Sequence, residues 1–325
     1  MSRRNLPSRI PTPLCVALAL VLLAGSTRFP QGFAHPGDGI DVDSHGTIYF
    51  TDVKRQTLWK LSPEGDLTAA LTGRWSHGMC VDAKDRVWLE VEVNNTQFAV
   101  VRLETDGSET TIIGPTERGL DVYGVNILAD AEDNLYFPHS DPPRFFARGL
   151  RHRAPDGAVR LIAGSERLGH RDGLGSHASF TAVQSLCWGP DQDIYLVDRD
   201  TIRRVSLDGA VETLYRDVRD ASPERQPFDN GNPDVSNRLY GLDVEPNTGA
   251  VVVAYHGNRA VLRLSPTGKE TLYQADKPWS PVGVVLDQDR LLIKESGLEP
   301  GSPIAGPRIR ARSADGVVST LITVE

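Results

Sequence analysis

Hydrophobic and polar positions alternate in short runs along residues 35–325. The stretch SHGMCVDAKDRVWLEVE (76–92) is typical: an apolar run, a polar turn, and a second apolar run that ends on acids. Alternation over a few residues predicts a β-strand, because successive side chains of a strand point to opposite faces. No long run with the 3.6-residue period of a helix follows the N-terminal segment. The pattern therefore predicts an all-β chain.

A turn made of a polar residue and a glycine recurs along the chain, each time between two short alternating runs. Two such runs joined by this kind of turn are typical of a β-hairpin. A second pair of runs lies upstream of each hairpin, so each unit is predicted to contain four strands. The turns are Glu64-Gly65, Asp106-Gly107, Asp156-Gly157, Asp208-Gly209, Thr267-Gly268 and Asp315-Gly316.

Serial units of four strands indicate a six-bladed β-propeller with four antiparallel strands in each blade. A pair of β-sandwiches is the alternative, but a sandwich does not require the same turn in every successive unit. The sixth unit has its own last run, VVSTLITVE (317–325), which allows the ring to close without a borrowed strand; residues 27–36 are the other possible source. The expected blades are 37–73, 75–115, 121–165, 178–216, 237–276 and 280–325.

The N-terminal segment differs from the rest of the chain. MSRRNLPSRIPTP is basic and has no acid, and the apolar run LCVALALVLLAG (14–25) and small residues follow it. This order predicts a secretory signal peptide over residues 1–34, cleaved within 26–34, and hence a secreted or periplasmic protein. An uncleaved anchor is the alternative, although the run is shorter than the roughly 20 residues that span a bilayer. We expect no transmembrane segment in the mature chain.

Charge and cysteine content narrow the possible partners. The formal net charge is −8 and no basic cluster follows the first residues, so we expect no nucleic-acid partner. Outside the signal segment only Cys80 and Cys187 remain. They fall two blades apart, beyond the roughly 7 Å between Cα atoms that a disulfide allows, so both are expected to be buried and unpaired. Both occupy one equivalent position of the first strands, which Asn126 is expected to occupy in blade 3.

Strand direction predicts where polar side chains gather. The starts of the first strands and the ends of the second strands must lie on one face of a propeller, around the mouth of its central channel. The long insertions fall on this face and only tight turns on the other, as expected for a ligand-binding surface. The strand starts are Asp38, His77, Tyr123, Gln184, Tyr240 and Val282, and the strand ends are Asp52, Glu90 with Glu92, His139, Asp198, His256 and Glu295.

Two sets of candidate residues follow. The ligand-binding candidates are Asp38, His77, Tyr123, Gln184, Tyr240, Glu90, Asp198 and Glu295. The candidates for acid–base catalysis are His77, Tyr123, Tyr240, His139 and His256. A structural role is the alternative for Asp52 and Asp198, because an aspartate at a strand end often caps a neighbouring turn.

Residues 164–214 resemble an NHL repeat. The shared features are the glycine-rich lead DGLGSHASF, a Gly-Pro-Asp turn, a strand ending in VD, and the hairpin IRRVSLDGAVETL. The resemblance covers about one blade and implies a propeller of the NHL-repeat type. The other five blades carry looser versions of the pattern.

HGMCVDAKDRVWLE (77–90) resembles the inner strand pair of the gluconolactonase and regucalcin-like propellers. That resemblance implies hydrolysis of sugar lactones with one divalent cation held by a Glu, an Asn and an Asp at the channel mouth. His77 stands at the position of that Asp, and Asp38 is the second possible ligand. An Asp–His pair suits zinc or manganese better than calcium or magnesium.

Two functions remain open. The first is a secreted NHL-like propeller that binds a small-molecule, glycan or protein ligand through its long-loop face at the channel mouth. The second is an enzyme: a metal-dependent lactone or ester hydrolase of the lactonase type, or a metal-free acid–base lyase or cyclase at the same mouth. The incomplete metal-ligand set favours the binding function.

Overall fold

The computed structural model describes residues 37–94, 97–115, 126–139, 147–165, 167–216, 239–297 and 305–325. The chain divides into two units, Met1–Ala34 and His35–Glu325, and all described residues belong to the second. The expected signal segment, Tyr123 and most of three of the expected long insertions (residues 140–146, 217–238 and 298–304) lie outside the described residues. The apolar run of the signal segment is among them, and no described helix is long and apolar enough to span a bilayer.

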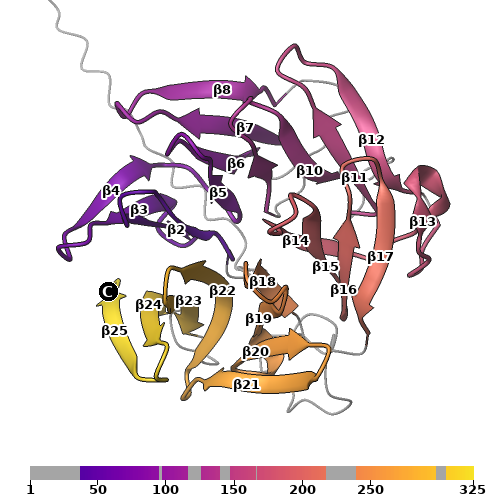
Figure 1. The fold of residues 1–325 in the computed structure, drawn as a ribbon. Helices are drawn as coiled ribbons and strands as arrows, with labels where there is room; N and C mark the ends of the chain where they lie inside the picture. The colour runs from indigo at the N-terminus through magenta and orange to yellow at the C-terminus, as the bar shows by residue number, and fades with distance from the viewer. Residues whose placement is uncertain are drawn as a thin grey trace, which may run out of the picture. The chain divides into compact units, whose positions relative to one another are not determined.

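Six antiparallel sheets form the second unit, and Figure 1 shows them in chain order from indigo to yellow. The first three sheets are β1 (Ile40–Val42), β2 (Ile48–Asp52), β3 (Thr57–Leu61) and β4 (Leu67–Thr72); β5 (Met79–Val81), β6 (Val87–Asn94), β7 (Gln97–Leu103) and β8 (Glu109–Ile113); and β9 (Leu128–Ala129), β10 (Leu135–His139), β11 (Gly149–Arg153) and β12 (Val159–Gly164). The last three are β14 (Val183–Trp188), β15 (Ile194–Asp198), β16 (Thr201–Val205) and β17 (Ala210–Tyr215); β18 (Leu239–Val244), β19 (Val251–Tyr255), β20 (Ala260–Ser265) and β21 (Gly268–Gln274); and β22 (Trp279–Asp287), β23 (Arg290–Gly297), β24 (Ala305–Ser313) and β25 (Val318–Thr323).

This arrangement confirms the predicted all-β, six-bladed propeller with four antiparallel strands in each blade. The fourth sheet has one addition, because β13 (Gly173–Leu174) pairs with the outer strand β17. The six glycines of the repeated turn all adopt a positive φ, the backbone region that favours glycine. They are Gly65, Gly107, Gly157, Gly209, Gly268 and Gly316.

The first strands pack against one another as the inner ring of the propeller. β1 contacts β5, β5 contacts β9, β9 contacts β14, β14 contacts β18, β18 contacts β22, and β22 contacts β1. The hydrophobic core lies between neighbouring sheets: Phe50 and Trp88, for example, are fully buried within second strands. Strands buried on both faces need apolar residues at most positions, which explains runs such as VVVAY in β19.

The ring closes between the sixth blade and the first. The Lys294 Nζ donates to the carbonyl oxygens of Gly37 at 2.8 Å and Gly39 at 3.1 Å. Gly283 on β22 lies so close to blade 1 that a Cβ at this position would stand 2.4 Å from the Asp38 carbonyl oxygen. Within the described ranges, the sixth sheet contains only its own four strands. The described strands thus close the ring without a borrowed strand.

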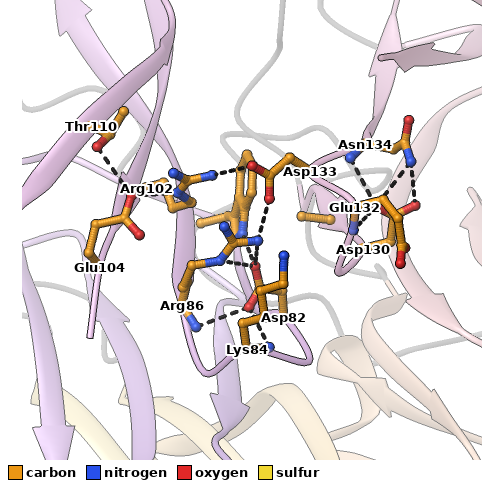
Figure 2. Close-up of polar contacts among 12 residues, drawn as sticks. Asp82, Lys84, Arg86, Arg102, Glu104, Thr110, Asp130, Glu132, Asp133 and Asn134 are labelled. Atoms are coloured by element: carbon orange, nitrogen blue, oxygen red, sulfur yellow. Dashed lines mark hydrogen bonds and ion pairs between the residues drawn. The ribbon is translucent and has the colours of Figure 1, made fainter. Parts of the chain in front are cut away.

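The turns between first and second strands carry a paired network of charges, which we call the turn-edge network (Figure 2). Asp82 accepts hydrogen bonds from the Arg86 Nε at 2.7 Å and from the Trp88 Nε1 at 2.8 Å. Arg102 donates to Asp133 of the next blade at 2.9 Å, and Asp133 also pairs with Arg86. Both guanidinium groups lie over the Trp88 ring. Every charge in this network has an opposite charge beside it.

The two cysteines outside the signal segment are buried and form no disulfide, as predicted. Cys80 pairs with Trp88 and Cys187 pairs with Tyr195 across their first two strands. In blade 3 the equivalent residue is Leu128, which pairs with Tyr136, and not Asn126. Counting along the sequence misplaces blade 3 by two residues because its lead is longer.

Candidate functional site

The ends of the second strands present two sets of side chains, because successive residues of a strand face opposite ways. The pairing of each second strand with its first strand shows that Ile48, Val87 and Leu291 occupy equivalent positions, and we count each of them as the first residue of its strand. Asp52, Asp198 and Glu295 are then fifth residues, whereas Glu90 is a fourth residue together with Thr51 and Lys294. The sequence comparison grouped Glu90 with Asp52, and the pairing register corrects this: the two carboxylates lie on opposite faces of their strands.

Asp52 is held by its own blade. It accepts hydrogen bonds from the Arg55 backbone N–H at 3.1 Å, the Arg55 Nη1 at 3.0 Å and the Trp59 Nε1 at 3.3 Å. Glu295, at the equivalent position of blade 6, accepts from the Tyr273 hydroxyl at 2.9 Å and the Arg308 Nε at 2.7 Å. Both carboxylates therefore have structural partners.

Asp198 caps a turn, as the structural alternative predicts. Its Oδ1 accepts from the backbone N–H groups of Thr181 and Ala182, both at 2.8 Å. Its Oδ2 accepts from the fully buried Arg203 at 3.0 Å and lies 3.2 Å from the His170 Nδ1. These contacts account for the strand that ends in VD and for the arginine that follows it.

The glycine-rich lead of the NHL-like segment surrounds the same arginine. Arg203 donates to Asp172 at 2.9 Å and to the Ser179 carbonyl oxygen at 3.3 Å, and its guanidinium lies 5.1 Å from the centre of the Phe180 ring. Thr213 on β17 also donates to Asp172, at 2.7 Å. The NHL-like motif thus acts as a structural clasp, with Arg203 at its centre.

The fourth residues of the second strands face the first strands of the ring. Thr51 lies 3.3 Å from the His77 carbonyl oxygen, and Lys294 donates to the Thr51 Oγ1 at 2.8 Å. Lys294 is 3% exposed and uses all three ammonium protons on the oxygens of Gly37, Gly39 and Thr51. The fourth residue of the second strand therefore joins blade 1 to blade 2 through Thr51 and blade 6 to blade 1 through Lys294.

Glu90 occupies the same position in blade 2, and it lacks such partners. The residue is 0% exposed, and neither carboxylate oxygen accepts a hydrogen bond of normal geometry within the described ranges. Burial raises the pKa of Glu90 well above its ordinary value, and the charges of Glu92 and Asp38 act in the same direction. A weak hydrogen bond from the His77 backbone, outside normal geometry, opposes the shift of the Glu90 pKa only in part.

Asp38 and Lys294 form an electrostatically coupled pair. Burial raises the pKa of Asp38 to about 6, while the charge of Lys294 and a hydrogen bond from Ser185 oppose that shift. Burial lowers the pKa of Lys294 to about 7, and the carboxylates of Asp38 and Asp52 oppose that shift. Both groups therefore titrate close to neutrality.

His77 lies beside Glu90 at the start of blade 2. The residue is buried, and its ring stacks on Trp75 with 6.3 Å between ring centres. Trp75 in turn pairs with Glu92 in an isolated antiparallel bridge, in which the Glu92 N–H donates to the Trp75 carbonyl oxygen at 2.7 Å. The pairing of Met79 with Leu89 and the Trp75–Glu92 bridge differ in register by one residue, so His77 lies at a β-bulge. The His77 backbone contacts the Glu90 carboxyl group.

The remaining candidates lie in other blades. Tyr240 and His256 meet edge to face, with 5.3 Å between ring centres, and the His256 Nδ1 lies 3.3 Å from the Pro281 carbonyl oxygen. His139 is buried at the end of β10. Gln184 lies at a bulge of β14, and its Oε1 has no partner in the described part of the chain.

Sequence reasoning missed several polar residues close to the axis. Asn126 accepts from the Met79 N–H at 3.0 Å and donates to the Ser185 hydroxyl at 3.1 Å, so it links blades 2, 3 and 4. Ser185 then connects to Asp38 of blade 1. Lys294 had a visible signal, because a lysine inside the apolar run LLIKE must find buried partners.

A second buried layer carries two aspartates with a structural role. Asp41 accepts from the Val42 and Val81 N–H groups at 2.8 and 2.7 Å. Asp243 accepts from the Val244 and Leu286 N–H groups at the same two distances. Burial raises the pKa of Asp41 to about 7 and that of Asp243 to about 6. Each carboxyl group clasps one first strand to the next.

The residues present fit a divalent cation poorly. In the described part of the chain, no three His, Cys, Asp or Glu side chains are arranged to hold a metal ion. Asp38 already interacts with the Lys294 ammonium, whose charge repels a cation. Among the described residues, Asp38 and His77 thus have no third ligand, which such a site requires.

Comparison with known proteins supports the fold. No protein-family model and no curated protein matches the chain. Three similar solved structures are a gluconolactonase from Xanthomonas campestris (17% identity over 80% of this chain and 82% of that one, TM-score 0.54), regucalcin, a calcium-binding protein, from Agrobacterium tumefaciens (16%, 82% and 84%, 0.53) and virginiamycin B lyase from Staphylococcus aureus (13%, 88% and 94%, 0.51). At these identities the likeness shows the fold, which is the propeller type expected from the sequence.

Proposed function

We propose that the protein binds a small-molecule ligand at the mouth of its central channel, on the face where first strands start and second strands end. One observation carries this proposal: Glu90 is fully buried, yet neither of its carboxylate oxygens accepts a hydrogen bond of normal geometry within the described residues. Burial of a polar group without a partner costs about 1–3 kcal/mol, and more when the group is charged.

The other buried charged residues on this face have partners, so Glu90 is an exception among them. Asp52, Asp198 and Glu295 each pair with an arginine, and Lys294 uses all its donors. An ionisable group with a strongly shifted pKa and no structural partner is typical of a functional site. Glu90 is therefore the group that we expect a ligand to satisfy.

The test is a binding screen of the purified full-length protein against cationic, neutral and anionic small molecules, read by NMR. Binders are expected to shift the indole resonance of Trp75 and to lose at least about tenfold in affinity in Glu90→Ala, which corresponds to about 1.4 kcal/mol. Glu64→Gln, an exposed carboxylate in a turn on the opposite edge, is the matched control. Binders with equal affinity for wild type and Glu90→Ala, or a screen without binders, would contradict the proposal.

A second candidate is acid–base catalysis without a metal, favoured by the Asp38–Lys294 pair, whose pKa values are about 6 and about 7. Groups that titrate near neutrality are suited to proton transfer. Turnover of lactones and esters in the presence of a chelator is the measurement. Asp38→Asn is expected to reduce the rate about 100-fold or more, and Glu64→Gln to leave it unchanged. No turnover above the buffer rate would exclude this candidate for those substrates.

We also propose that residues 1–34 direct export and are removed. The basic start, the apolar run and the small residues after it support this. Mass spectrometry of the exported protein is expected to find a new N-terminus within residues 26–34. An exported protein that keeps Met1 and stays in the membrane fraction would show an uncleaved anchor instead.

A further inference from the structure

Four side chains gather at the start of blade 2: Trp75, His77, Glu90 and Glu92, which we call the blade-2 cluster. Glu90 and Glu92 are two residues apart in β6, so their side chains share one face of that strand. The Trp75 and His77 rings stack on each other. The Trp75–Glu92 bridge sets the two segments side by side. Two aromatic rings thus lie next to two carboxylates.

The ring geometry agrees with this register. The Trp75 and His77 rings stack with 28° between their planes, so both point to the same side of the segment. Directly opposite residues in an antiparallel pair have Cβ atoms about 5 Å apart, which brings Trp75 beside Glu92. The His77 backbone contacts the Glu90 carboxyl group. The cluster therefore has an aromatic wall and an acidic wall.

No described cation balances the charges of Glu90 and Glu92. The charges of Glu92 and Asp38 both add to the rise in the Glu90 pKa. Lys294 belongs to blade 6, and its three donors are engaged on blade 1. No ion pair to Glu90 or Glu92 is formed within the described residues. Within the described residues, the Glu90 and Glu92 carboxyl groups therefore have no cationic partner.

We propose that the blade-2 cluster binds the protonated amine of an organic ligand. This inference rests on the proposed binding function and names the ligand class. An ammonium group donates charge-assisted hydrogen bonds to a carboxylate, and a tryptophan face attracts the same cation. A metal ion fits less well, because no described group of three ligand side chains converges. An organic cation is larger and bridges more widely spaced groups.

The experiment compares matched pairs of small probes by calorimetry: 2-phenylethylamine with 2-phenylethanol, and propylamine with propanol. Each pair has one shape and differs in charge at neutral pH. We expect each amine to bind wild type at least about tenfold more tightly than its alcohol, since a charge-assisted hydrogen bond and a cation–π contact each contribute about 1 kcal/mol or more.

Variants assign that difference to the cluster. Glu90→Gln keeps the shape of the side chain and is expected to weaken amine binding about tenfold or more, with alcohol binding changed by less than about twofold. Trp75→Leu is expected to weaken amine binding several-fold, and Glu64→Gln to leave both probes unaffected. Thermal unfolding of each variant verifies that it is folded.

The outcomes separate this inference from the proposed function. Equal binding of amine and alcohol, with both weakened in Glu90→Gln, overturns the amine inference and keeps a ligand site at the channel mouth. Amine binding that is insensitive to Glu90→Gln overturns the inference as well. If no probe binds up to millimolar concentration, the amine inference is wrong, and the mixed screen above decides whether any ligand site remains.

Discussion

Buried charged side chains have partners of opposite charge at one end of blade 2 and none at the other end within the described residues. At the turn edge, Asp82, Arg86, Arg102 and Asp133 form a network in which every charge is neutralised (Figure 2). At the other end of the same strands, Glu90 is completely buried with no partner in the described ranges. The charges of the turn-edge network have partners within the fold, whereas Glu90 is the group for which we propose a ligand as the partner.

Glu90 also differs from the other acids on the strand-start edge, the face where first strands start and second strands end. Asp52 and Asp198 end two similar strands, IYFTD and IYLVD. Both side chains accept backbone N–H groups of a turn and pair with an arginine. Glu90 is shifted by one residue along its strand, which turns its side chain to the other face. A position, and not a residue type, distinguishes the structural carboxylates from the unsatisfied one.

The largest effect is expected for Lys294→Met, which tests whether the strand-start edge also contains essential pairs. The substitution removes three hydrogen bonds between blades 6 and 1 and leaves Asp38 without its cation. Breaking a buried pair on one side costs about 3–5 kcal/mol. The measurement is the free energy of unfolding in urea. A loss below about 1 kcal/mol would show that Lys294 does not hold the ring closed.

Arg86→Met breaks the turn-edge network and is expected to cost about 2 kcal/mol, since Arg86 is slightly exposed. Asp82 would remain fully buried with the Trp88 Nε1 as its side-chain donor. Urea denaturation measures the loss. An unchanged stability would remove the contrast between the two ends of blade 2.

Glu90→Gln tests whether the end of blade 2 that carries Glu90 is destabilised by an unpartnered carboxyl group. We expect the variant to be more stable than wild type by about 1 kcal/mol at neutral pH. The pKa of Glu90 is raised above its unfolded value of 4.5, so folding favours the protonated form. The resulting penalty is absent at low pH and grows as the pH rises above about 4.5. In Glu90→Gln the decrease of stability above that pH should therefore be smaller than in wild type.

The control for this measurement is Glu64→Gln, which should follow the wild-type pH profile. A destabilised Glu90→Gln variant, with an unchanged pH profile, would mean that Glu90 has a structural partner after all. Unfolding monitored by tryptophan fluorescence between pH 4 and 8 provides both curves.

The smallest effect is expected for Arg102→Met, about 1 kcal/mol or less, because Arg86 still neutralises Asp133. Differential scanning calorimetry of the single variants and of Arg86→Met/Arg102→Met measures their coupling. A non-additive loss in the double variant is expected, since both arginines share Asp133. Strict additivity would argue against a network.

The site was only partly predictable, and particular residues show why. The sequence correctly placed His77 at the start of blade 2, because the run after it alternates clearly. Asn126 was aligned wrongly, since the lead of blade 3 is longer and sequence counting has no other reference. Glu90 was grouped with the capped acids because a shift of one residue is invisible until the pairing register is known.

The sequence by itself determined the number of blades, the four strands of each and the turns that join them. Alternation and turn glycines are local properties, and local geometry is enough to express them. Only the tertiary structure decided which buried charges have partners. Those partners come from other blades: Lys294 reaches Gly37, Asp41 reaches Val81, and Glu90 reaches none in the described residues. Such contacts depend on ring closure and strand register, which no local pattern specifies.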